Sequence, residues 1–384
     1  MKRNYFITFL GSILLPTIVS AVSPCELSSL SGSIGQRLAS KYSSKQILEF
    51  KNNLQAECIM QADFKSLSDR SKILNVDLDM MNTYKALSYV KREWYEWGKS
   101  NNVQVPYIYQ KYRDPITRTR EIWDNAMLGM SQVEEVSRTL RSRDLSLDDL
   151  QEWHRGFYQL SDEVGDFNHE PNPGSFKASP GYSDRAINEA INVYWWRWGD
   201  LDSEIVRSEL ENIEKVNGYF YQYNLIGTTS DDRLNFFLKG DQTGVIINPY
   251  FLESKTIFLV RFINTYKKII NDKYENLRFY NYPLLTPLQF ASLVQKWLVI
   301  IHPWSEGNGR MTRLIQDGLA NLYGLPAQTS GELMDIDVTT PVQDYYEKMY
   351  SYTMENLEKM GNCLSGYERN SLRVIQSYDC KIIE

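Results

Sequence analysis

The sequence has few of the residues that usually build metal and nucleic-acid sites. Its 384 residues include only three histidines and four cysteines, and no two cysteines have C-x-x-C spacing, which argues against structural zinc. The formal charge is −6, so the chain lacks the basic field that draws a protein to nucleic acid. With 42% hydrophobic and 23% charged residues, the composition excludes a disordered or fibrous chain.

Long apolar runs are also missing after the first 21 residues. That first stretch begins with Lys2 and Arg3, continues through an almost wholly apolar run at 5–19 and ends in small residues up to Ala21. This is the pattern of a cleaved signal peptide, and we expect cleavage after Ala21. The alternative is an uncleaved anchor, against which the short run, broken by a glycine and a proline, argues. The mature protein is then expected to be secreted or periplasmic, without a membrane segment.

The four cysteines lie near the two ends of the chain. In an oxidising compartment, pairing of nearest neighbours predicts Cys25–Cys58 and Cys363–Cys380, which is one of three connectivities. The alternative is four buried free thiols. No N-x-S/T sequon occurs, so a bacterial export signal is the more natural interpretation.

Residues 26 to 225 show apolar residues mostly at helical spacing. The clearest predicted helices span 46–60, 77–97, 119–140 and 187–223. A stretch rich in Pro, Gly and Ser at 170–184 interrupts them. We therefore divide the chain into a signal peptide (1–21), a large helical N-terminal region of unknown role (22–225) and a second unit (226–384).

The second unit begins with two short β-prone runs, 234–238 and 245–247, around a turn at 239–244 that contains glycine, which predicts a hairpin. Helical spacing resumes at 252–273. Thr286 followed by Pro287 predicts the start of a helix that runs to His302. Further helices are predicted at 314–323 and 338–360.

The most informative stretch is 301–313, IHPWSEGNGRMTR. A helix ends at His302, a loop with Gly307, Asn308 and Gly309 follows, and a new helix begins near Arg310. Backbone N–H groups of such a loop, with the positive end of the new helix, form an anion-binding site. Arg310 and Arg313 are three residues apart, so both guanidinium groups can hold phosphate oxygens on one side.

Two other polar residues complete this constellation. Glu306 offers a hard carboxylate ligand for Mg²⁺ beside a phosphate. His302 is suited to accept a proton from an attacking hydroxyl. Together these residues predict phosphoryl or nucleotidyl transfer, whereas each of them alone would be interpreted as a helix cap. His154 and His169 are interpreted as ordinary helix and loop residues.

The 301–313 stretch resembles the signature of Fic-domain proteins, HxFx(D/E)GNGRxxR. It departs at Trp304, which stands where the family has phenylalanine, in a position that anchors the loop to the core. The resemblance implies a mainly α, Fic-type helical core with a small β-hairpin flap, and a 226–384 catalytic domain with a C-terminal tail. The N-terminal 200 residues resemble no family that we can name.

The resemblance also implies a function. Fic enzymes mostly transfer AMP from ATP to a Ser, Thr or Tyr hydroxyl of a target protein. Carried over, His302 is the general base, Glu306 the Mg²⁺ ligand, Gly307, Asn308 and Gly309 the phosphate cradle, and Arg310 and Arg313 the stabilisers of the distal phosphates. The alternatives are a non-catalytic protein that binds nucleotide or a partner, and a Fic enzyme that transfers another phosphate-linked group.

Export of an enzyme that uses ATP makes most sense if it acts inside a host cell, so a virulence effector with a host protein as target is the leading biological interpretation. An envelope enzyme is the alternative. Many Fic enzymes are inhibited by a helix carrying [S/T]xxxE[G/N], and residues 351–356, with Glu355, match this short pattern. Chance explains such a match as well, and a solvated Glu355 or one paired with a lysine is the interpretation we favour.

Overall fold

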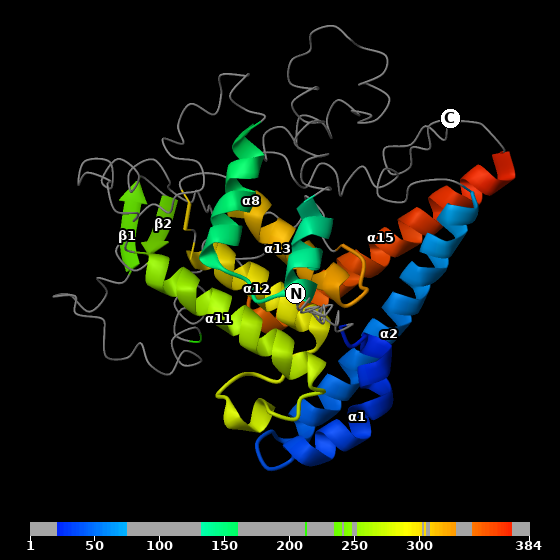
Figure 1. Ribbon diagram of the computed structural model, residues 1–384, viewed down its shortest axis with the longest axis horizontal. Coiled ribbons are helices and arrows are strands. Elements are labelled where there is room, and N and C mark those ends of the chain that lie inside the picture. The colour runs from blue at the N-terminus through cyan, green and yellow to red at the C-terminus, as the bar shows by residue number, and fades with distance from the viewer. Residues whose placement is uncertain are drawn as a thin grey trace, which may run out of the picture.

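The computed structural model describes residues 21–74, 132–159, 212, 234–239, 242–247, 252–301, 303–304, 308–327 and 340–370. Within these ranges the fold is mainly helical, with one antiparallel pair of strands (Figure 1). The prediction of a mainly α chain with a small hairpin is therefore confirmed. The predicted signal peptide up to residue 20, the predicted helix at 77–97, the predicted helix at 187–223 except residue 212, and the boundary at 225 lie outside the described residues.

The described chain opens with a pair of helices, α1 (Pro24–Leu38) and α2 (Ser44–Ile73), each with a serine cap. The Ser43 side chain and Gln46 satisfy each other's backbone N–H groups in a capping box, which fixes where α2 starts. A disulfide with an S–S distance of 2.06 Å joins Cys25 of α1 to Cys58 of α2, as predicted. Cys363 is also disulfide-bonded, and Cys380 lies outside the described residues.

Three helices form the centre: α11 (Leu252–Asn271), α12 (Pro287–Ile301) and α13 (Asn308–Leu322). A short 3-10 helix, η3 (Leu277–Phe279), lies between α11 and α12. Every residue of α12 is buried, as expected of a helix surrounded by others. Its predicted start is confirmed, because the Thr286 N–H donates to Gln289 Oε1 at 3.1 Å and the Gln289 N–H to Thr286 Oγ1 at 3.4 Å.

Helix α15 (Val342–Asn370) packs on α12 and runs beside α2 (Figure 1). It starts after Pro341, later than the predicted 338, and extends ten residues past the predicted end at 360. Proline cannot continue a helix from a preceding turn but is tolerated at its very start, which accounts for the later beginning.

The hairpin consists of β1 (Leu234–Lys239) and β2 (Gln242–Ile247), paired from Leu234–Ile247 to Lys239–Gln242. Only two residues separate the strands, so the predicted turn at 239–244 was too long. A two-residue connection matches the right-handed twist of paired strands. The strand pairing therefore extends beyond the β-prone residues, as far as Lys239 and Gln242.

Helix α8 (Leu147–Gln159) and a preceding helix at 132–142 belong to the N-terminal region, yet they lie on the central helices. A Cβ added at Gly318 of α13 would lie 2.2 Å from Val136 Cγ1, so this contact requires glycine. Buried apolar residues from both sides of position 225, among them Phe50, Val136, Trp153 and Trp297, form one contiguous core. Among the described residues, no helix combines the length and apolarity that crossing a membrane would demand.

Candidate functional site

The structure describes part of the predicted site. Asn308, Gly309, Arg310 and Arg313 lie in the first two turns of α13. The other predicted site residues, His302, Glu306 and Gly307, lie outside the described residues. The neighbours of His302, Ile301 and Pro303, are described. Helix α13 begins at Asn308, two residues before the predicted Arg310, so the glycine-rich loop leads directly into a helix N-terminus.

Arg313 folds back toward the start of its own helix. A Cβ added at Gly309 would lie 3.2 Å from Arg313 Nη1 and 3.8 Å from Cζ, so the guanidinium group lies against the glycine. Side chains of a helix point toward its N-terminus, which brings this group to the turn whose N–H groups have no helical acceptor. Both Arg313 and Arg310 are buried, at 5% and 3% exposure. The start of α13 thus combines positive charge with a positive helix end.

Asn308 holds the loop together with its side chain. The Trp304 N–H donates to Asn308 Oδ1 at 3.0 Å, and Asn308 Nδ2 donates to the Trp304 carbonyl at 2.7 Å. These two hydrogen bonds join the two ends of segment 304–308. They use both the carbonyl oxygen and the amino group of the Asn308 side chain. The Asn308 side chain therefore links the start of α13 to Trp304, and the role of Asn308 in a phosphate cradle stays a prediction.

Trp304 is fully buried, as expected of an anchor. Its indole stacks on the imidazole of His154 in α8, with ring centroids 4.9 Å apart and planes 8° from parallel. His154 is also fully buried. The anchor of the motif loop thus packs on a residue of the N-terminal region, and in this structure His154 is a packing group of the loop.

The Glu57 side chain of α2 contacts the start of α12, the helix whose other end leads to the motif. The Thr286 hydroxyl donates to Glu57 Oε1, and the Leu288 N–H donates to Glu57 Oε2 at 3.2 Å. Glu57 is almost fully buried at 2% exposure. Burial raises the pKa of Glu57 to about 8, because these hydrogen bonds offset only part of the lost hydration.

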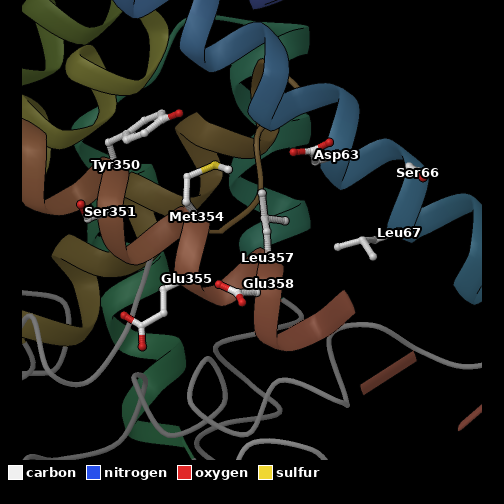
Figure 2. A pocket seen from close by; sticks show the side chains of 9 residues that line it. All are labelled: Asp63, Ser66, Leu67, Tyr350, Ser351, Met354, Glu355, Leu357 and Glu358. Carbon is white, nitrogen blue, oxygen red and sulfur yellow. The ribbon is translucent and has the colours of Figure 1, made fainter. Parts of the chain in front are cut away.

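Glu355 of the short inhibitory pattern lies elsewhere. It is half exposed, at 53%, and pairs with Lys359 at 2.8 Å, as the favoured interpretation expected. It lines an open groove of about 570 Å³ between α2 and α15, with Asp63, Ser66 and Glu358 among the other polar residues. Figure 2 shows Leu67 of α2 and Leu357 of α15 turned toward each other within this groove.

The sequence interpretation missed the parts played by His154 and Glu57. For His154 a signal existed: it follows Leu150 by four residues and so shares the apolar face of an amphipathic helix. Glu57 carries no such signal, since its partner lies 229 residues away in the chain.

The arrangement at the start of α13 suits a multiply charged anion. A helix N-terminus, adjacent backbone N–H groups and a guanidinium group at the same turn are the elements of phosphate sites. Within the described residues, no group of three His, Cys, Asp or Glu side chains could hold a metal ion.

Similarity to known proteins is found among solved structures. No protein-family model matches the sequence, and no curated protein matches it. A Fic-domain-containing signalling protein from Bacteroides thetaiotaomicron aligns with a TM-score of 0.45 and 13% identity, covering 80% of this chain and 96% of that one. Fic-1 from C. elegans aligns with a TM-score of 0.36 and 14% identity, covering 91% of this chain and 85% of that one. Both of these solved structures are of Fic-domain proteins, whose signature the 301–313 motif resembles.

Proposed function

We propose that this chain is a Fic-type transferase that moves AMP from ATP to a Ser, Thr or Tyr hydroxyl of a target protein. The observation that carries the proposal is the Arg313 guanidinium against Gly309, at the N-terminus of the helix that follows the glycine-rich loop. The motif spacing sets a base and an acid beside this positively charged turn, which are the groups that phosphoryl or nucleotidyl transfer requires.

Each residue of the motif has one role in this chemistry. His302 takes the proton of the target hydroxyl, whose oxygen attacks the α-phosphorus of ATP. The bond from that phosphorus to the oxygen bridging it to the β-phosphorus breaks, so pyrophosphate leaves and AMP remains on the target. Backbone N–H groups of 307–309 hold the α- and β-phosphates, and Arg310 and Arg313 bind the distal phosphates and the leaving charge.

Glu306 would hold Mg²⁺ together with the phosphates. The donor set fits, because one carboxylate beside phosphate oxygens is the usual protein share of a Mg²⁺ site. The ion supplies charge neutralisation on the phosphates when bound.

The test uses the mature chain, residues 22–384, with Mg²⁺ and α-labelled ATP, with CTP, UTP and CDP-choline in parallel. We expect label on the protein itself or on an added target from ATP, and none with His302→Ala. Calorimetric titration with ATP separates binding from transfer: Arg313→Ala should weaken binding roughly tenfold or more, since a hydrogen bond to a charged group contributes about 1.5–3 kcal/mol. Binding without any transfer would favour the non-catalytic alternative.

The compartment belongs to the same proposal. The Cys25–Cys58 disulfide supports an oxidising destination, since such bonds are rare in the bacterial cytosol. We therefore propose that the mature enzyme acts in the periplasm or outside the cell, with delivery into a host cell as the step that brings it to ATP. Finding the protein confined to the periplasm during growth with host cells would contradict delivery.

A further inference from the structure

His154 is a buried polar side chain that contacts Trp304 of the motif. It belongs to α8, in the region whose role the sequence left open, and it is 0% exposed. Its ring lies nearly parallel to the Trp304 indole, at 4.9 Å between centroids. Aromatic stacking of this kind shifts a local equilibrium by roughly 2- to 12-fold beyond the effect of burial alone.

Trp304 transmits this contact to the anion site. Its backbone N–H and carbonyl are both bonded to the Asn308 side chain, at 3.0 and 2.7 Å, and Asn308 is the first residue of α13. Gly309 and the Arg313 guanidinium follow within the next turns. A side chain that fixes the indole therefore also fixes where α13 begins.

We propose that His154 is a positioning residue for the phosphate loop, acting through the flat face that it offers to Trp304. The indole that stands where the similar family has phenylalanine is here covered by an imidazole from α8. At least part of the N-terminal region therefore helps to fix Trp304 and, through Asn308, the start of α13. The catalytic meaning of this role rests on the proposed function, whereas the effect on the loop does not.

The experiment compares two substitutions of similar size in the mature chain. His154→Leu keeps the volume but removes the flat face, and His154→Phe keeps the flat face. Hydrogen–deuterium exchange is followed without nucleotide in peptides covering 303–313, with peptides from α1 and α2 as internal reference. Arg155→Ala, at the exposed neighbouring position, is the matched control.

We expect His154→Leu to speed exchange in 303–313 by roughly 2- to 12-fold and to leave α1 and α2 unchanged. His154→Phe and Arg155→Ala should stay close to the wild type. Three results would overturn the proposal: unchanged exchange at 303–313 in His154→Leu, equal acceleration throughout or global unfolding, or a His154→Phe chain that behaves like His154→Leu.

A titration with ATP and Mg²⁺ on the same proteins keeps the two proposals apart. If the wild type binds ATP and His154→Leu binds it more weakly while His154→Phe does not, both proposals stand. If the wild type binds no ATP, the proposed function fails, and the exchange result alone decides the role of His154.

Discussion

Helix α12 is held in different ways at its two ends. At its start, a buried carboxylate from α2 accepts hydrogen bonds from Thr286 and Leu288. After its end, Trp304 is held by a stacked imidazole from α8 and by a double amide bond from Asn308. One end therefore depends on the ionisation of an acid and the other on shape and neutral hydrogen bonds, so changes of pH and changes of packing should affect them separately.

The largest effect is expected at the motif end. His302→Ala should lower the transfer rate by on the order of 10² to 10⁴, the usual contribution of a general base, and should leave ATP affinity nearly unchanged because the phosphate site remains. Rates of label transfer and calorimetric titration measure the two quantities. Wild-type activity in this variant would show that His302 is not the base.

Gly309→Ala tests the Arg313 arrangement at the same end. The new Cβ would lie 3.2 Å from Arg313 Nη1, so the guanidinium group must shift by a few tenths of an ångström. We expect about tenfold weaker ATP binding from the disturbed charged contact, with unchanged or slightly higher thermal stability because alanine favours a helix by about 1 kcal/mol over glycine. Ser351→Ala, on an exposed helical site of α15, serves as control. Unaltered affinity in Gly309→Ala would show that ATP binding does not depend on the contact between Arg313 and Gly309.

The start of α12 should respond to pH. The pKa of Glu57 is raised to about 8 in the folded chain, so the folded state binds this proton more tightly than the unfolded state does. Stability from this group is complete below about pH 4.5 and is lost as the pH rises through about 8, a change on the order of 5 kcal/mol.

Glu57→Gln should flatten this part of the pH profile, leaving stability near pH 5 similar to that of the wild type and raising it near pH 8. Chemical unfolding at several pH values measures the difference. Equal slopes in the two proteins would mean that Glu57 is ionised in the fold.

The smallest effect is expected at Glu355, which lines the groove between α2 and α15. It is half exposed and pairs with Lys359, an i, i+4 pair worth only about 0.3–0.5 kcal/mol. Glu355→Ala should therefore leave self-labelling and ATP affinity within about twofold of the wild type. A large gain in self-labelling would instead identify α15 as an inhibitory helix.

Local features of the fold could be predicted from the sequence. The helix start at Thr286, the hairpin and the nearest-neighbour disulfide all depend on residues close together in the chain. The fold-back of Arg313 onto Gly309 also follows from helix geometry, since side chains point toward the helix start.

Contacts between distant segments could not be predicted in the same way. Nothing near Glu57 indicates Thr286 as its partner, and nothing near His154 indicates Trp304, because a single sequence shows which face is apolar but not what covers it. The exact extent of the hairpin turn was missed for a related reason: pairing across the strands, rather than the residues of the turn, decides where the ladder stops.

The core shared by both halves of the chain bears on how this protein can be divided. A fragment that began at residue 226 would keep α11, α12 and α13 but lose Val136 against Gly318 and His154 against Trp304. Its central helices would then expose apolar surface that the N-terminal helices cover in the whole chain. The motif is thus not a portable module, and neither truncation nor domain exchange at this point should yield a soluble, active piece.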